Sequence, residues 1–431
     1  MLTLRVAAFV LSLAIAVGAQ DVTADRVLLS RVLQRVGDDL KLQRDVSCLE
    51  TISREFKPAT GKLRPLDTVQ LEVLTTGHKE LYASPGARNF SENPPIDFVG
   101  SGVIGDGFFG LYLAKLVNGG ISFTWKGFEE SGGRRLARWD YQVPLEFSGQ
   151  SFVLQEGSGA VSLRGSFWAS PDTFSVVRLA VAIGDIPATL PLASSTWVID
   201  YAPATVARNL TVLLPQTARF EMTKLSGESS HSRMAFTQCR TFAAESSLSF
   251  NDAGPAQFAA SSVDDTLRPL PAGIEIPVKL ATRLTGDMTV GALIDGVVEK
   301  NIAQKGQRLI PAGALVRGRI RRLESYSEPK PYYTVAIEYT ELTIEGVRYR
   351  FDAALSRIDA AGNVSTTLAV TGRGLDNLAA RSTNPAMRAG ATALESIQFV
   401  ALPGVATFFV SGARLDLPQG LQTVWTTVRR R

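Results

Sequence analysis

Histidine and cysteine are scarce in this sequence, which has two residues of each among 431. Structural zinc sites use roughly four Cys or His ligands at short spacings, and His78, His231, Cys48 and Cys239 lie too far apart in the chain to form such a pattern. Charge of one sign is also lacking, because 45 Lys and Arg stand against 41 Asp and Glu. We therefore expect no metal, no cofactor and no nucleic-acid partner.

Long hydrophobic runs are absent after the first residues of the chain. The run Val6–Val17 follows a positively charged start and precedes small residues that end at Ala19, a pattern typical of a secretory signal peptide. About a dozen apolar residues are too few to span a bilayer comfortably. We expect a signal peptide over 1–19, cleaved after Ala19, and a mature protein in the periplasm or outside the cell that is not an integral membrane protein.

The two cysteines are expected to pair in that oxidising compartment. A Cys48–Cys239 disulfide requires Cα atoms roughly 4.4–6.8 Å apart. It would close a long loop and stabilise the fold by about 5 kcal/mol in the chain-entropy account.

The apolar spacing changes along the first half of the chain. Residues 22–54 have helical spacing, and from Leu66 the apolar residues recur with period two. Short strand-like segments, with 210–214 and 220–225 as separate strands, predict an antiparallel meander. Residues 108–117 interrupt it as a helix that we expect to pack on the concave face of the sheet.

The second half begins after a stretch with the composition of a linker. We expect a half-barrel over 20–250, a linker over 251–268, a β domain over 269–356, a flexible segment over 357–395 and closing strands over 396–431. A hairpin is expected to join 333–339 to 347–355 through Glu345-Gly346. The fold class is mainly β (α+β), with a curved antiparallel sheet around helices and a smaller C-terminal β domain.

Two short motifs resemble known functional motifs, one for dinucleotide binding and one for nucleophilic catalysis. Gly100–Gly105 matches a dinucleotide-binding glycine pattern, but it lies inside the meander without a βαβ unit, so we interpret it as an entry to the helix. Ser229, Ser230 and His231 place a nucleophile near a base, but no serine elbow surrounds them. We predict that the protein is not an enzyme.

Aromatic residues are concentrated on the central strands, where they form either a sheet core or an apolar cavity for a lipid chain or hydrophobic peptide. The sequence leaves both interpretations open. The candidate cavity residues are Phe108, Leu111, Tyr112, Phe123, Trp125, Trp139, Phe167 and Trp168.

Several phrases carry resemblances to known families. The run from Gly165 through Trp168 to Thr173, followed by Val177-Arg178-Leu179, is similar to the half-barrel of LolA-type lipoprotein carriers and RseB-type envelope-stress sensors. That resemblance implies an apolar cavity for acyl chains. The phrases LPAGIEIPVKL and LIPAGALVRGRI resemble the β domain of TrbI-like scaffolds of conjugation and type IV secretion systems. The whole arrangement also resembles a group of exported bacterial proteins of unknown function.

Three functions follow as hypotheses. The first is a periplasmic envelope binding protein whose half-barrel holds a lipid or lipoprotein moiety, while the β domain docks to an envelope protein. The second is a structural scaffold component of a cell-envelope assembly. The third is an exported hydrolase, which would need a cluster of Ser, His and Asp residues or paired carboxylates.

Overall fold

The computed structural model describes residues 24–43, 45–76, 79–87, 89–99, 103–154, 157–242, 267–304, 307–327, 331–358 and 404–429. The expected signal peptide lies outside these ranges. So do the linker up to residue 266, the expected flexible segment from 359 onward, and the start of the expected closing strands up to residue 403.

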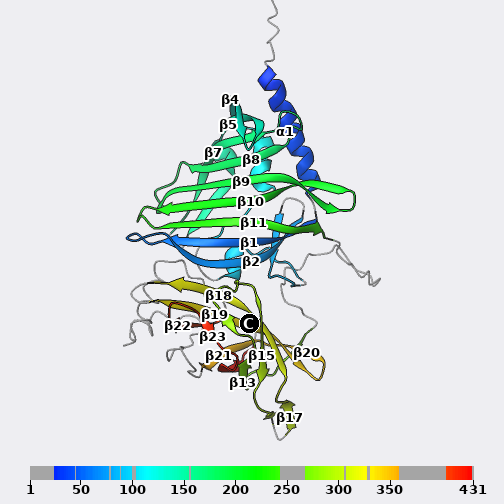
Figure 1. Ribbon diagram of the computed structural model, residues 1–431, viewed down its shortest axis with the longest axis vertical. Coiled ribbons are helices and arrows are strands. Elements are labelled where there is room, and N and C mark those ends of the chain that lie inside the picture. Colours follow the sequence, from blue (N-terminus) through cyan, green and yellow to red (C-terminus); the bar gives the residue numbers. More distant parts are fainter. Residues whose placement is uncertain are drawn as a thin grey trace, which may run out of the picture.

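The first part of the chain forms an antiparallel sheet of eleven strands (Figure 1). Its order is β3-β2-β1-β11-β10-β9-β8-β7-β5-β4, with β6 paired to β7. The strands are β1 (Val46–Lys57), β2 (Arg64–Thr76), β3 (Lys79–Ala83), β4 (Ser122–Ser131), β5 (Arg134–Val143), β6 (Gln150–Leu154), β7 (Gly157–Ala169), β8 (Val176–Gly184), β9 (Leu192–Ala207), β10 (Leu210–Lys224) and β11 (Ser229–Thr241).

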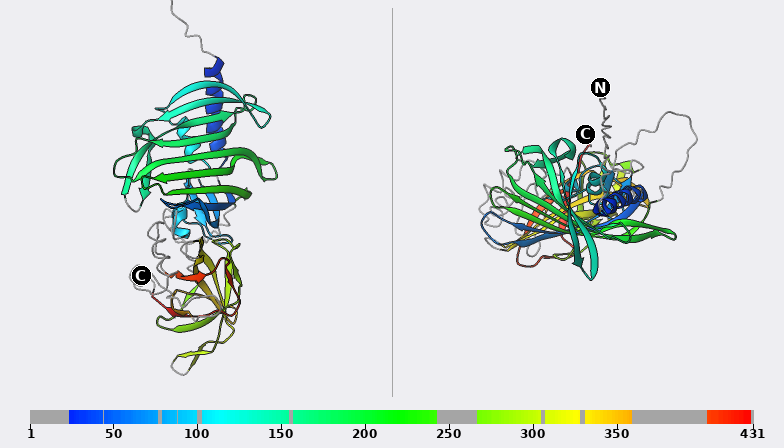
Figure 2. Two further views of the ribbon diagram at one scale, coloured as in Figure 1. Left: turned by 60° about the vertical axis from the view of Figure 1, so that its left-hand side comes forward. Right: turned by 90° about the horizontal axis from the view of Figure 1, so that it is seen from above.

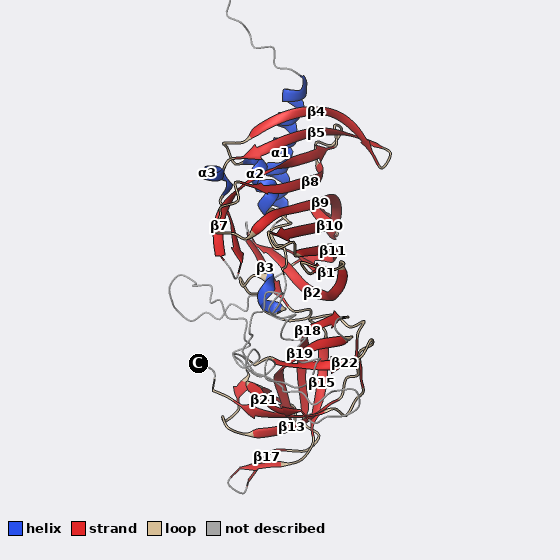
Figure 3. Cartoon of the chain, turned by 90° about the vertical axis from the view of Figure 1, so that its left-hand side faces the viewer, coloured by secondary structure: helices blue, strands red, loops and turns tan. Residues whose placement is uncertain are grey.

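The sheet is curved into a half-barrel, and helices lie on its concave face (Figures 2 and 3). The helices on this face are α1 (Ala24–Leu42) and α2 (Leu111–Val117). The short α3 (Leu145–Ser148) lies beside β7, and the 3-10 turn η1 (Pro95–Phe98) follows β3 in the chain. The mainly β fold with a curved sheet around helices is as expected. None of the helices described here has both the length and the apolar character needed to cross a bilayer.

The second part of the chain forms a nine-stranded sheet with the order β12-β20-β19-β18-β15-β13-β24-β21, and β22 pairs with β19. Its strands are β12 (Arg268–Pro269), β13 (Glu275–Leu280), β15 (Leu293–Val298), β18 (Leu315–Tyr326), β19 (Tyr332–Ile344), β20 (Val347–Arg350), β21 (Ala353–Ile358), β22 (Ala406–Ser411) and β24 (Gln422–Thr427). Two small ribbons pair β14 (Leu284–Thr285) with β23 (Asp416–Leu417), and β16 (Ile302–Gln304) with β17 (Gln307–Ile310). The turn at Glu345-Gly346 is confirmed, since β19 pairs with β20 and both turn residues have positive φ. The second arm is shorter than expected, because it ends at Arg350 and residues 353–355 pair with β24 instead.

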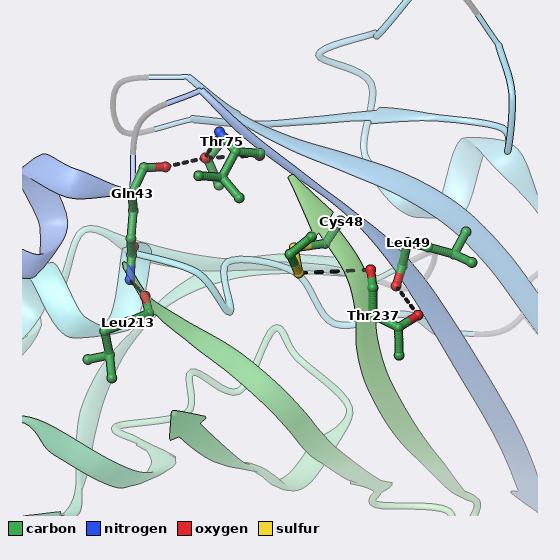
Figure 4. Close-up of a disulfide and its surroundings, with 8 residues drawn as sticks. Gln43, Cys48, Leu49, Thr75, Leu213 and Thr237 are labelled. Carbon is green, nitrogen blue, oxygen red and sulfur yellow. Dashed lines mark hydrogen bonds between the residues drawn. A yellow bond between two sulfur atoms is a disulfide. The ribbon is translucent and has the colours of Figure 1, made fainter. Parts of the chain in front are cut away.

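The first helix ends earlier than its sequence pattern predicts. Residues 46–54 belong to β1 rather than to the helix, and Asp45, with φ +58°, turns the chain between them. Gln43 fixes the end of α1, because its Nε2 donates to the carbonyl of Leu213 at 2.6 Å and its own carbonyl accepts from Thr75 (Figure 4). Val46, Cys48 and Ile52 are buried on one face of the strand, and pairing with two neighbouring strands overrides the helical spacing of residues 46–54.

Strand β10 also differs from the prediction, because it continues through Pro215 where the sequence indicated two separate strands. Proline has no N–H to donate to a ladder. The pairing of β10 with β9 shifts register between Pro215 and Thr217. This bulge removes the need for a donor at Pro215, so the strand is not interrupted.

The predicted disulfide joins Cys48 on β1 to Cys239 on β11, with Cα atoms 4.1 Å apart, just below the expected range (Figure 4). The two strands are neighbours and their register shifts between Ser47 and Leu49. Gln238, at φ +51°, is the extra residue of this bulge. The bond therefore links adjacent strands, and not the end of the first helix as the sequence suggested.

The C-terminal sheet docks on the free edge of the half-barrel. Strand β3 pairs only with residues 72–76 of β2 and leaves the earlier part of that edge uncovered. Val290 lies beside Val69 in a parallel bridge, donates to the carbonyl of Thr68 at 2.8 Å and accepts from Gln70 N at 2.9 Å. The contact satisfies backbone groups that would otherwise leave an exposed strand edge.

Two buried ion pairs lie at the same junction. Arg54 on β1 pairs with Asp67 on β2 at 2.5 Å, and Arg322 pairs with Glu324 on β18 at 2.6 Å, with all four side chains at most 2% exposed. The charges of Arg322 and Glu324 influence the pKa of both Arg54 and Asp67. Tyr326 donates to Glu324. Each ion pair is formed within one sheet, and the pairing compensates for the burial of its charges at the junction.

Replacing both cysteines tests the disulfide. The double variant Cys48→Ala/Cys239→Ala should lower the free energy of unfolding by about 2–5 kcal/mol, because the bond closes a loop with a sequence separation of 191. Urea unfolding under oxidising conditions measures the change. A reductant should bring the unmodified protein to the stability of the variant and leave the variant unaffected. An unchanged midpoint in the variant would contradict this account.

The junction charges can be tested by breaking one pair. Asp67→Ala removes the carboxylate to which Arg54 donates two hydrogen bonds and should cost about 3–5 kcal/mol in urea unfolding. The matched control replaces both partners with apolar residues, Arg54→Met/Asp67→Leu, and should cost much less because neither charge of this pair remains. Equal losses in the two variants would show that packing, and not charge pairing, holds this region.

Candidate functional site

The concave face of the half-barrel carries a row of aromatic side chains on β4, β5 and β7. Cross-strand pairing places Trp125 beside Trp139 and Trp139 beside Phe167. Trp139 and Phe167 stack with ring centroids 5.2 Å apart, and Trp125 lies 4.8 Å from Trp139. Side chains alternate between the faces of a strand, and the register shift between Trp125 and Gly127 brings Phe128 to the same side as Trp125. We call this surface the aromatic face (Phe123, Trp125, Phe128, Trp139, Phe167).

The deep part of the aromatic face is sealed. Trp139 is 1% exposed and Phe167 is 0% exposed. An aromatic ring facing a water-sized void would retain accessible area, so these rings are in contact with other side chains. In the ligand-free structure this part is therefore sheet core.

The outer part of the aromatic face lies on β4, the last strand of the sheet. Phe123 and Trp125 are only partly buried, and Phe128 is 43% exposed. Phe128 packs edge-on against Trp125 at 5.2 Å, and the Arg135 guanidinium lies 3.8 Å over its ring. Apolar rings thus pass without a break from the core to the rim of the half-barrel.

Helix α2 and its entry cover another part of the concave face. Phe108 lies 6.2 Å from Phe236 on β11, and Tyr112 lies 5.4 Å from Trp197 on β9. Both are 2% exposed, as expected for residues that pack on the sheet. Leu111 differs from the prediction: the helix begins at this residue and turns its side chain outward, where it is 36% exposed.

Trp168 does not join the aromatic face. It follows Phe167 on the same strand and therefore points to the opposite face. Its indole N–H donates to Glu129 at 2.7 Å, and Arg138 lies 5.1 Å over its ring. Glu129 also pairs with Arg138, and these bonds hold the pKa of the Glu129 carboxyl below its usual value. Because consecutive residues of a strand point to opposite faces, the sequence alone already indicates that Phe167 and Trp168 cannot both face the cavity.

Three carboxyl groups with a raised pKa were not singled out by the sequence. Glu50 is buried and points inward from β1, Glu80 on β3 is half-buried, and Asp106 before α2 is exposed. Desolvation raises the pKa of all three groups, and the charges of Glu80 and Asp106 raise that of Glu50 further. Oε1 of Glu50 has no hydrogen-bond partner in the described part of the chain. The alternation of Cys48, Glu50 and Ile52 would have revealed an inward-facing acid if β1 had been recognised.

Glu80 is the best connected of these acids. Oε2 accepts from the backbone N–H of Gly107 at 2.8 Å and from the Tyr82 hydroxyl at 2.6 Å, and Oε1 accepts from the N–H of Phe109 at 3.0 Å. These bonds lower the pKa of Glu80 but do not offset the larger effect of burial. No group of three or more His, Cys, Asp or Glu side chains within the described ranges has the geometry to hold a metal ion.

The structure supplies a third group beside the Ser229–His231 pair, which the sequence did not indicate. Ser229 Oγ lies 3.2 Å from His231 Nε2, and Glu221 on β10 places Oε1 3.8 Å from His231 Nδ1. The three residues lie along paired strands, where the N–H groups around the serine belong to sheet ladders. Acyl transfer needs free N–H donors aimed at the developing oxyanion, and this strand arrangement does not offer them.

No protein-family model matches the sequence, and no curated protein matches it. Among solved structures the chain is similar to a DUF1329 family protein from Desulfovibrio piger, with 10% identity, a TM-score of 0.27, and 50% of this chain and 92% of that chain covered. It is similar to a LolA superfamily protein from Nitrosomonas europaea, with 9% identity, a TM-score of 0.24 and coverages of 49% and 94%. It is also similar to ComB10 of the Com type IV secretion system of Helicobacter pylori, with 12% identity, a TM-score of 0.19 and coverages of 37% and 86%.

With identities of at most 12% and TM-scores of at most 0.27, these likenesses carry no argument about this chain. The function has to be argued from the residues of this chain.

The raised pKa values of Glu50, Glu80 and Asp106 predict that stability depends on pH in the range above their usual pKa. A group whose pKa is raised in the folded state stabilises the fold fully below its unfolded pKa, and that contribution is lost as the pH rises through the folded value. The melting temperature should therefore fall between pH 5 and pH 8. At pH 8 the ionised Glu50 carboxylate is disfavoured by its burial. Glu50→Gln removes this charge and should raise the melting temperature at pH 8 by a few degrees, at about 2–4 °C for each kcal/mol.

Differential scanning fluorimetry across that pH range measures the effect. The control is Glu130→Gln, which changes an exposed residue on β4 and should leave the profile unchanged. A variant at Glu50 that melts lower than the unmodified protein at pH 8 would show that the carboxylate has a stabilising partner.

Proposed function

We propose that this protein is a non-catalytic binding protein of the bacterial envelope whose half-barrel holds an acyl chain of a lipid or lipoprotein on the aromatic face. The chain enters beside β4, where Phe123, Trp125 and Phe128 form the rim. The C-terminal sheet is the part that docks to a protein partner in the envelope.

The continuity of the aromatic face carries this proposal. Burying apolar surface is favourable by roughly 25 cal/mol per Å², yet Phe128 is 43% exposed in direct contact with the more buried Trp125. An apolar ligand laid along this rim would complete the burial. No comparable gain arises for a polar ligand, because rings offer few hydrogen-bonding groups and a polar group without a partner costs free energy to bury.

An acyl chain fits these features better than a peptide does. A peptide brings an N–H and a C=O for each residue, whereas an acyl chain brings none to its apolar contacts. Arg135 over Phe128 places a cation at the rim, where a phosphate or carboxylate head group would be stabilised. The Cys48–Cys239 bond supports an oxidising compartment outside the cytoplasm, which is where the expected signal peptide would deliver the protein.

The experiment compares two tryptophans that differ in the face they occupy. The full chain, exported to the periplasm of a bacterial host, is purified without detergent, extracted with organic solvent and analysed by mass spectrometry. We expect co-purifying lipid at near-stoichiometric amounts. Trp125→Ala should lower that amount about tenfold or more, because an aromatic contact is lost at the rim. The matched control, Trp168→Ala, changes the opposite face and should retain the lipid.

Two results would contradict the proposal. One is the absence of lipid in the unmodified protein, and the other is an equal loss in both tryptophan variants. Lipid-free protein that is crosslinked to envelope proteins in intact cells would favour the structural scaffold instead.

A further inference from the structure

The half-barrel sheet has two edges, and within the described residues the chain covers only one of them. At the β2 edge, Val290 donates to the carbonyl of Thr68 and accepts from the N–H of Gln70, so two backbone bonds complete that strand. At the other edge lies β4, which pairs with β5 alone among the described strands (Figure 3). A strand in this position presents unpaired N–H and C=O groups to a partner.

Strand β4 has few of the features by which natural proteins protect an edge. It has ten residues, about twice the usual strand length, and it contains no proline. The register shift between Trp125 and Gly127 and the charge of Lys126 protect its middle. The segment 127–131, after the shift, is therefore the part of the edge to which a partner strand can pair.

The turn between β4 and β5 determines which backbone groups of this segment point outward. Gly132 and Gly133 have φ +55° and +72°, as a two-residue type I′ turn requires. The two residues that flank the turn are paired and therefore form a hydrogen-bonded pair. Bonded and non-bonded pairs alternate along antiparallel strands, so the N–H and C=O groups of Phe128 and Glu130 point away from β5.

The side chains at these two positions indicate the chemistry of the partner strand. Phe128 is 43% exposed on the concave side, and Glu130, two residues further on, lies on the same face. Glu130 is exposed, and Arg135, which is opposite it on β5, lies over the ring of Phe128. Apolar pairs and oppositely charged pairs across strands are favourable. An apolar residue therefore fits opposite Phe128, and a basic residue fits opposite Glu130.

We propose that the β4 edge accepts an extended segment of a protein partner, which adds to the half-barrel as a further antiparallel strand at Phe128 and Glu130. The segment carries an apolar residue and a basic residue two positions apart, both directed to the concave side. Main-chain bonds give such a contact its affinity, and alternate side chains give its specificity. This inference does not rest on the proposed function, because the edge lies in the plane of the sheet and the acyl chain lies on its face.

A second copy of β4 meets these requirements less well than a segment of another protein. Antiparallel pairing of two β4 strands centred on Glu130 places two carboxylates opposite each other, which is destabilising. Pairing centred on Glu129 places each Phe128 opposite a Glu130. Pairing centred on Phe128 places Glu130 opposite Lys126, which lies at the register shift and already pairs with Asp140.

Peptide binding to the delipidated full chain tests the edge. The probe is a fluorescein-labelled heptapeptide in which valine, valine and lysine alternate with threonine, and fluorescence polarisation should show saturable binding. The same peptide N-methylated at valine and lysine should not bind, because the N–H groups that face β4 are removed. The matched control is N-methylated at threonine, where the N–H groups point away from β4, and should bind.

Two substitutions at one position separate the backbone from the charge. Glu130→Pro removes an outward N–H without a loss to the β5 ladder, since proline is tolerated on an edge strand where its nitrogen faces solvent. It should weaken peptide binding about tenfold or more. Glu130→Gln keeps the N–H and should weaken binding only about two- to threefold.

Hydrogen–deuterium exchange locates the bound peptide. Binding should slow the exchange of residues 123–131 and leave peptides from β7 unchanged. A lack of saturable binding, or equal binding of the two N-methylated peptides, would overturn the proposal. So would Glu130→Pro that binds as tightly as Glu130→Gln. If Glu130→Pro does not fold, the two N-methylated peptides decide the question on the unmodified protein.

Sedimentation velocity of the full chain without peptide identifies the alternative occupant. We expect a monomer in the unmodified protein. A dimer that is lost in Glu130→Pro would assign the β4 edge to a second copy of this chain and overturn the assignment to another protein.

Discussion

The alternation of side chains along β1 is the constraint on which the rest of the structure depends. Cys48, Glu50, Ile52 and Arg54 share one face of this strand, since its pairing with β2 runs without a shift from Val46 to Arg54. Cys48 forms the disulfide with β11, and Arg54 forms the ion pair with Asp67 at the junction. Glu50 is the acid whose pKa is raised by desolvation and by the charges of Glu80 and Asp106. A slip of one residue would move all of them to the other face.

The same register logic separates the two faces at the far end of the sheet. Phe167 enters the aromatic face, and its neighbour Trp168 joins a polar set with Glu129 and Arg138. The apolar face is deep and sealed near Trp139 but open at the last strand. Because β4 is the last strand of the sheet and carries aromatic side chains, apolar area stays exposed there.

Carboxyl groups on the concave side show how the half-barrel combines apolar and polar contacts. Glu80 compensates part of its burial with bonds from two backbone N–H groups and a tyrosine. Glu50 has fewer compensating contacts, which is why burial and the neighbouring charges act so strongly on its pKa. Glu80 positions the entry to α2 through these bonds. Burying Glu50 costs free energy that the rest of the fold must offset.

The sequence by itself determined the mainly β class, the period-two strands, the disulfide pair and the hairpin at Glu345-Gly346, because these depend on local periodicity and residue chemistry. It mistook residues 46–54 for helix, because short apolar runs fit both periods until neighbouring strands are known. Only the tertiary structure decided which rings are sealed and which are exposed, how Glu80 meets Gly107, and how Val290 covers the edge of β2. Those contacts join residues distant in the chain, and their geometry follows from strand order and register, which local sequence does not specify.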